Sequence, residues 1–159
     1  MRSGSSTPTS PRSPMDTIPL GDLIEKIWDV IAEVKPNVVY LVHDGDVHTD
    51  HRVVFTATLS VLKSFYMRKW DVQRILCYET LSSTEVAPPQ PYRFFVPTVY
   101  SEITPYLHEK AQIMNMYETE AQSELLPRGQ SAIYALARYR GATIGVEYAE
   151  AFMLIREVN

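Results

Sequence analysis

The stretch that decides the fold runs over residues 37–54 and reads NVVYLVHDGDVHTDHRVV. Its first part, VVYLV at 38–42, is a short continuous apolar run, as expected of a strand buried on both faces in a parallel sheet. Its second part crowds together six side chains able to bind a metal or move a proton, which are His43, Asp44, Asp46, His48, Asp50 and His51. The stretch therefore predicts a buried strand whose carboxyl end carries a loop capable of chemistry.

The flanking segments continue an alternation of helices and strands. Before the stretch, apolar residues recur at helical spacing, and Pro36 ends that helix; the apolar positions are Leu20, Leu23, Ile24, Ile27, Ile31 and Val34. After it, residues 50–69 predict a second helix, and VQRILCYE at 72–79 predicts a second buried strand. This order predicts a doubly wound α/β fold with a mostly parallel sheet flanked by helices. Ligands bind such sheets at the carboxyl ends of the strands, where the polar loop lies.

The rest of the chain predicts a smaller set of elements. A long loop at 81–91 is rich in proline and serine, and a loop of that length is often a substrate lid. The elements expected after it are one or two short strands within 94–103, a helix capped by Thr104 and running to about Tyr117, a helix from Ser131 to Tyr139 ended by Gly141 and Gly145, and a closing strand AEAFMLIRE at 149–157.

Composition narrows the class of protein. The 159 residues suggest one domain over 15–159, preceded by a Ser/Pro-rich segment at 1–14 that we expect to be a disordered tail. The net charge is −4 and no basic stripe interleaves with aromatic residues, so we expect no nucleic-acid partner. No apolar run approaches the roughly 20 residues of a membrane span. The single cysteine, Cys77, is expected in the core and fits a reducing, cytoplasmic location.

Calcium and zinc are the two metals that the polar loop suggests. A calcium loop is rejected, because Thr49 stands where that loop needs glycine and Phe55 where it needs glutamate. For zinc, His48 and His51 are three positions apart, as neighbours on the first turn of a helix would be. A catalytic zinc usually takes three protein ligands, and His108 lies in a helical pattern where a surface position is expected.

The carboxylates of this loop can also be explained without a metal. Asp44, Asp46 and Asp50 can serve simply to cap the following helix and to favour its positive end. Composition alone leaves the helix cap and the metal site as equal alternatives.

The same stretch resembles the second motif of the LmbE-like, or PIG-L, family of zinc-dependent N-deacetylases. That motif, H-x-x-D-x-H-x-D-H-R between a strand and a helix, is matched by His43, Asp46, His48, Asp50, His51 and Arg52. Three later segments resemble later parts of the family in the same order, and they are YETLSSTE at 78–85, FFVPTVYSEIT at 94–104 and ALARYRGATIGVEYAEAF at 135–152. The resemblance covers residues 15–159.

The resemblance implies a Rossmann-like fold and hydrolysis of an acetamide on an N-acetylglucosaminyl conjugate by a zinc-bound water. By matching position, His51 would be a zinc ligand, His48 would stabilise the developing oxyanion, and Asp50 would orient that histidine. Asp46 and Arg52 would have structural or substrate-contact roles, and Glu79 would lie on the substrate side.

One family motif has no counterpart in this sequence. Family members begin with a strand ending in an A-H-P-D-D-E-like motif, which supplies two further zinc ligands and the general base. We therefore expect a truncated chain that is weakly active or inactive. The alternatives are a non-catalytic fragment or interaction protein, and a subunit that gains ligands from a partner chain. A strand at 38–42 without its neighbour would expose an apolar edge, which predicts a homo-oligomer or an aggregation-prone monomer.

Overall fold

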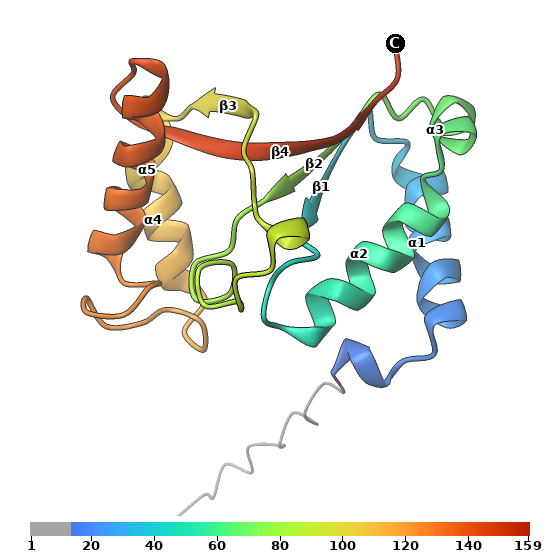
Figure 1. Cartoon of the computed structure of the whole chain (residues 1–159), viewed down its shortest axis with the longest axis horizontal. Coiled ribbons are helices and arrows are strands. Elements are labelled where there is room, and N and C mark those ends of the chain that lie inside the picture. Colours follow the sequence, from blue (N-terminus) through green and yellow to red (C-terminus); the bar gives the residue numbers. More distant parts are fainter. Residues whose placement is uncertain (1–13) are drawn as a thin grey trace, which may run out of the picture.

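The structure is a computed structural model that describes residues 14–159 (Figure 1). The predicted tail at 1–14 therefore lies, apart from Pro14, outside the described residues. The elements are, in order, η1 (Met15–Thr17), α1 (Leu20–Val34), β1 (Val38–Val42), α2 (Thr49–Val61), α3 (Ser64–Trp70), β2 (Arg74–Tyr78), η2 (Pro91–Arg93), β3 (Val99–Glu102), η3 (Thr104–Tyr106), α4 (Leu107–Met116), α5 (Gln130–Ile144) and β4 (Ala149–Glu157).

The four strands form one sheet in the order β1-β2-β4-β3. β1 and β2 pair in parallel, with Val38 opposite Arg74 and Val42 opposite Tyr78. β4 is antiparallel to both β2 and β3, so three strands share one direction and β4 runs against them. The predicted α/β class with flanking helices is confirmed, and the reversed β4 makes the sheet mixed rather than purely parallel.

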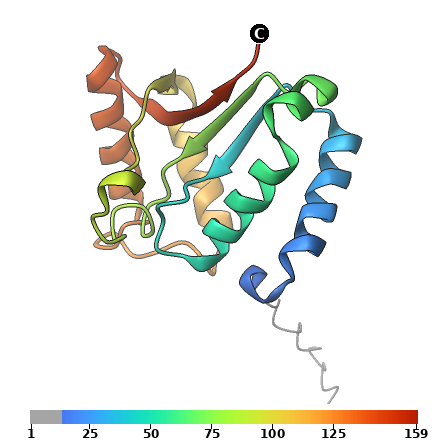
Figure 2. The ribbon, with the colours of Figure 1, turned by 45° about the vertical axis from the view of Figure 1, so that its right-hand side comes forward.

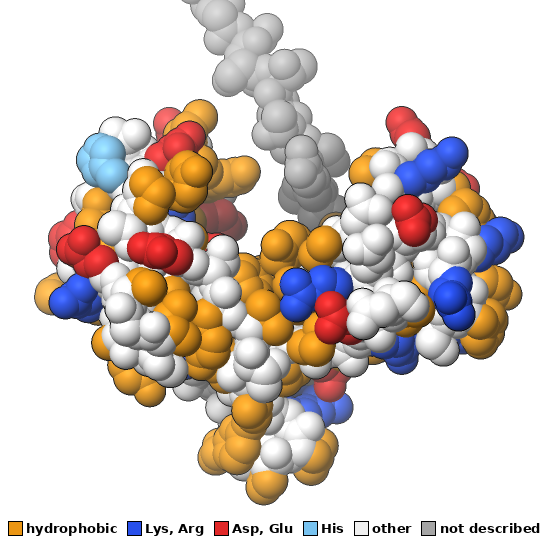
Figure 3. Space-filling model, turned by 90° about the horizontal axis from the view of Figure 1, so that it is seen from above, with side chains coloured by type: hydrophobic (Ala, Val, Ile, Leu, Met, Phe, Trp, Pro, Cys, Tyr) orange, Lys and Arg blue, Asp and Glu red, His pale blue; other side chains and the backbone are white. Residues whose placement is uncertain are grey.

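Helices lie on both sides of this sheet. α1, α2 and α3 gather on one side, and α4 and α5 lie on the other (Figures 1 and 2). The larger core packs the first group onto β1 and β2 and includes Leu41, Ile75, Cys77, Val61 and Met67. A smaller core lies where α4 and α5 meet the end of β3, around Ile103, Leu107, Ile133 and Ala137. Between the two helix groups the surface is hollowed, and its floor is largely hydrophobic (Figure 3).

β1 is the edge strand of the described sheet, because its only partner there is β2. Leu41 is buried against the helices, whereas Tyr40, on the opposite face, is 58% exposed. The expectation that residues 38–42 are buried on both faces is thus wrong for this structure. The reason is that α4 and α5 cover the sheet at β4 and leave the same face of β1 open.

The helix predicted over 50–69 is two helices, separated at Leu62 and Lys63. The bend turns both Leu62 and Met67 inward, and both are fully buried. It also frees the carbonyl of Leu62, which accepts a 2.7 Å hydrogen bond from Nη1 of Arg156 on β4. The burial of Leu62 and Met67 and the hydrogen bond from Arg156 therefore favour the bend over one continuous helix.

Two further boundaries differ from those predicted. α5 continues to Ile144 and ends at Gly145, which has φ of 77°, while Gly141 lies inside the helix. A Cβ at Gly141 would meet the carbonyl oxygen of Glu147 at 2.7 Å, so close packing rather than helix termination requires glycine there. Thr104 caps no helix; its Oγ1 accepts a 3.2 Å bond from the backbone N–H of Tyr148.

The elements predicted elsewhere are confirmed, including a closing strand at 149–157. Among the described residues, none of the helices combines the length and the apolar character that crossing a membrane requires.

Candidate functional site

The loop after β1 begins with a histidine that serves the fold. His43 is 3% exposed, and its Nε2 donates a 2.9 Å hydrogen bond to the carbonyl oxygen of Arg93. Its ring also packs edge-on against Phe95, with centroids 5.5 Å apart. The close packing around this hydrogen bond requires glycine at position 45, because a Cβ there would meet His43 Nε2 at 2.5 Å and clash with the Arg93 carbonyl. His43 thus joins the loop after β1 to the loop after β2.

Asp46 is the buried centre of the loop. It has no exposed surface, and its Oδ2 lies 2.6 Å from Nδ1 of His51. Its Oδ1 accepts a 2.6 Å bond from the hydroxyl of Thr84, and its carbonyl accepts a 3.3 Å bond from Nε of Arg52. Asp46 and Arg52 were predicted to have a structural or substrate-contact role, and in this structure both hold the loop together.

His51 is held through Nδ1, which leaves Nε2 as its available ring nitrogen. The side chain is 22% exposed, at the start of α2. A histidine held by a carboxylate through one nitrogen is the usual arrangement of a metal ligand that binds through the other.

His48 and Asp50 lie at the outer rim of the same loop. His48 is exposed, occupies the position before α2, and has its ring centroid 5.4 Å from that of His51. Asp50 does not bond to His48; its Oδ1 accepts a 3.0 Å bond from the backbone N–H of Asp16. Thr49 donates a 2.6 Å bond to the carboxylate of the same Asp16, so Thr49 and Asp50 join α2 to η1.

The helix-cap alternative accounts for part of this loop. Asp50 lies in the first turn of α2, where a negative charge is favourable, but no side chain caps the helix. Asp44 lies 3.6 Å from Nε of Arg93, and Asp46 faces His51 and Thr84. Of the three carboxylates, only Asp50 acts on the helix end.

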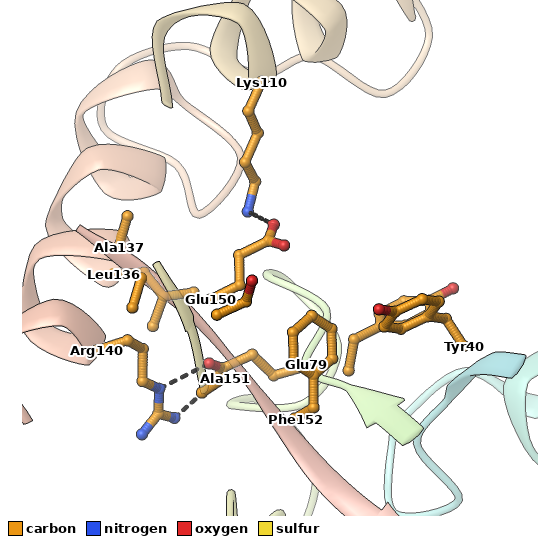
Figure 4. Close-up of a pocket in the computed structure, with 12 residues that line it drawn as sticks. Tyr40, Glu79, Lys110, Leu136, Ala137, Arg140, Glu150, Ala151 and Phe152 are labelled. Carbon is orange, nitrogen blue, oxygen red and sulfur yellow. Dashed lines mark hydrogen bonds and ion pairs between the residues drawn. The ribbon is translucent and has the colours of Figure 1, made fainter. Parts of the chain in front are cut away.

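Glu79, directly after β2, forms a bidentate pair with Arg140 of α5 (Figure 4). The two bonds are 2.7 and 2.6 Å long, and each side chain is 16% exposed. The hydrogen bonds to Glu79 raise the pKa of Arg140 above its ordinary value. Arg140 was not predicted as a site residue, because 61 positions separate it from Glu79 and its neighbours follow no chemical pattern.

The pair lines a cavity of about 470 Å³ between α5 and the open face of the sheet. Tyr40 and Phe152 form one wall, with ring centroids 5.2 Å apart. Lys110 reaches from α4 to Glu150 on β4 at 2.5 Å (Figure 4). The cavity therefore combines aromatic surface with two ion pairs whose charges cancel.

The pKa values of two side chains at the end of β2, Cys77 and Tyr78, are raised. Burial, with the negative charges of Asp46 and Asp44, raises the pKa of Cys77 to about 12. Burial and Asp46 also raise the pKa of Tyr78. Cys77 is fully buried in the larger core, as expected from the sequence.

The described residues include one side chain with the geometry of a zinc ligand, but they do not form a complete zinc site. In the part of the chain from 14 to 159, no three His, Cys, Asp or Glu side chains lie close enough to hold a metal together. Residues 1–13 contain none of these four residue types. His51 has the geometry of a ligand, yet a catalytic zinc takes three protein ligands. Zinc binding remains a prediction.

The sequence matches no protein-family model, and no curated protein is similar to it. Several solved structures share the fold. One is the conserved protein TT1542 from Thermus thermophilus, at 22% identity and a TM-score of 0.69, over 94% of this chain and 64% of that one. Another is N,N'-diacetylchitobiose deacetylase from Pyrococcus horikoshii, at 16% identity and a TM-score of 0.61, over 88% of this chain and 54% of the deacetylase.

A third similar structure is GalB, the 4-carboxy-2-hydroxymuconate hydratase of Pseudomonas putida KT2440. It shares 17% identity and a TM-score of 0.63, over 87% of this chain and 60% of GalB. The likeness to these three structures shows the Rossmann-like α/β fold. A deacetylase and a hydratase on one fold also show that the fold alone does not decide the reaction. The chain spans between 54% and 64% of the lengths of these neighbours.

Proposed function

We propose that this chain carries the histidine part of a zinc-dependent deacetylase site and has little or no activity by itself. The proposed substrate is an N-acetylglucosaminyl or related N-acetyl sugar conjugate. The observation that carries the proposal is the buried Asp46 holding Nδ1 of His51, with Nε2 left available at the carboxyl end of a parallel strand. That is where ligands bind in α/β sheets.

Two further observations support the choice of reaction. The H-x-x-D-x-H-x-D-H-R pattern of residues 43–52 resembles the LmbE-like and PIG-L deacetylases. A chitobiose deacetylase is among the proteins that share the fold. Both observations favour amide hydrolysis over the hydration that GalB performs.

Each residue of the loop has a role in this proposal. His51 would hold the metal through Nε2, and a bound zinc would lower the pKa of a water and polarise the amide carbonyl. His48, beside it, would donate an N–H to the oxyanion that develops on the carbonyl. Asp50 would orient His48 only after leaving its present contact with Asp16.

Glu79 would act on the substrate side of this site, and Arg52 would act on the loop. Glu79 presents its carboxylate to the cavity as a pair with Arg140, so it would offer a hydroxyl both an acceptor and a donor. Arg52 would fix the loop that carries both histidines.

The test is release of acetate from N,N'-diacetylchitobiose by the purified chain with added zinc. We expect a rate within about tenfold of the buffer blank, for two reasons. The described residues bring no three potential zinc ligands together, and the sequence has no counterpart of the family motif that supplies the general base. Rapid release that depends on zinc and disappears in His51→Ala would refute the inactivity. In that test His108→Ala is the matched control, because His108 is exposed on α4.

The second candidate is a non-catalytic interaction protein that keeps the α/β shell. The observation in its favour is that no three potential ligands gather anywhere in the described residues. The two candidates differ in one property: only the first requires that zinc bind at His51.

A further inference from the structure

The loops that follow β1 and β2 meet in a chain of hydrogen bonds. Thr84, in the loop after β2, lies 2.8 Å from the backbone N–H of Thr80 and 2.6 Å from Oδ1 of Asp46. Beside it, the N–H of Val47 donates a 3.2 Å bond to the carbonyl of Ser83. These contacts connect residues 80–84 to the loop that carries His48 and His51.

The direction of the hydrogen bonds at Thr84 follows from the chemistry of its partners. The N–H of Thr80 can only donate, so Thr84 Oγ1 accepts there. The single hydroxyl hydrogen of Thr84 is then directed to Asp46, whose Oδ1 accepts it. Thr84 therefore donates to Oδ1 and fixes the rotation of the carboxylate.

The same reasoning assigns the hydrogen on His51. Oδ2 of Asp46, 2.6 Å from Nδ1, accepts a hydrogen bond, so Nδ1 carries the hydrogen. A neutral imidazole has only one N–H, and Nε2 therefore holds the lone pair that binds a metal or accepts a proton.

We propose that Thr84 is a positioning residue for His51, acting through Asp46 to hold the ring in the tautomer with hydrogen on Nδ1. The loop after β2 then sets the state of the histidine that follows β1. The use of Nε2 as a ligand rests on the proposed function, whereas the tautomer itself does not.

The experiment is a long-range ¹H–¹⁵N NMR measurement of histidine tautomers in the full, metal-free chain at about pH 8, where an ordinary histidine is neutral. We expect His51 to be predominantly the Nδ1–H form. In Thr84→Val the Asp46 carboxylate is free to rotate away from Nδ1 of His51. Loss of that Asp46–His51 hydrogen bond, at about 1 kcal/mol, should lower the ratio of the Nδ1–H to the Nε2–H form about fivefold. Thr84→Ser should restore the ratio, and His108 should not change.

The proposal fails if wild-type His51 is mainly Nε2–H, or if Thr84→Val leaves the ratio unchanged. Thr84→Ala replaces the valine variant if valine does not fold, with the same expected loss. If Thr84→Val alone leaves the ratio unchanged, the deacetylase proposal still stands, because Nε2 of His51 keeps its lone pair. A wild-type His51 that is mainly Nε2–H would count against both proposals. Conversely, a correct tautomer in a chain that never binds zinc would overturn only the deacetylase proposal.

Discussion

At the scale of single residues, two carboxylates have different partners: Asp46 holds Nδ1 of His51, and Asp50 holds the backbone of Asp16. Matching to the family motif assigned Asp50 to His48, but Asp50 bonds to Asp16 while Asp46 holds His51. The sequence places all these residues in one loop, yet their contacts depend on η1 and on Thr84, which lie 33 or more positions away. Short-range spacing does not encode such contacts.

Gly45 gives a stability prediction at this scale. Gly45→Ala should lower the free energy of unfolding by about 1–3 kcal/mol, because a Cβ would overpack against His43 and the Arg93 carbonyl. Urea denaturation provides the measurement. Gly21→Ala is the control, since Gly21 lies in α1 with no atom near its Cβ position, and its stability should stay the same or rise slightly. Equal stability of both variants would show that the two loops are not packed as described.

Cys77 gives a prediction about pH. Its pKa is about 12 in the folded protein and 9.0 for an ordinary thiol, so above pH 9 the unfolded chain loses a proton that the folded one keeps. Stability from this group is fully present below pH 9 and declines above it, by at most about 1.4 kcal/mol for each pH unit. Unfolding curves of wild type and Cys77→Ala at pH 8, 9 and 10 should therefore converge as the pH rises. A constant difference between the two proteins would contradict the raised pKa.

At the scale of elements, continuous apolar runs predicted β1 and β2, and helical spacing of apolar residues predicted α1. The sequence did not predict the bend at Leu62, where inward packing and the bond from Arg156 outweigh a continuous helical pattern. Nor did it predict that α5 runs past Gly141, whose small size serves contact with Glu147. Both failures occur where a tertiary contact overrides a local preference.

The Glu79–Arg140 pair gives a prediction about how α5 is held to β2. Arg140→Ala should destabilise the protein by about 1–3 kcal/mol, because it leaves the mostly buried carboxylate of Glu79 without partners. Arg140→Lys should recover only part of this, since an ammonium cannot form the bidentate pair. The comparison is Lys110→Ala, whose pair with Glu150 is more exposed and should contribute less than about 1 kcal/mol. If thermal unfolding showed that Lys110→Ala destabilises the protein more than Arg140→Ala does, the Glu79–Arg140 pair would not be the stronger of the two ion pairs.

At the scale of the whole molecule, the hollow between the two helix groups and the unpaired edge of β1 leave one side of the described sheet open (Figure 3). We expect the purified chain to associate through this edge as its concentration rises. Tyr40→Lys should reduce association, because a charged side chain on an edge strand disfavours pairing with another chain. Light scattering over a concentration series measures this, with Tyr92→Lys as an exposed-aromatic control outside the strands. A wild-type chain that remains monomeric throughout would contradict the expectation.

We propose that His51 is the single zinc-ligand histidine of an incomplete site. The most direct measurement is equilibrium zinc binding by the wild-type chain, His51→Ala and His108→Ala in competition with a chelator. We expect weak binding by wild type, at least tenfold weaker binding by His51→Ala, and unchanged binding by His108→Ala. Tight binding typical of a complete three-ligand site, or binding that His51→Ala does not alter, would contradict it.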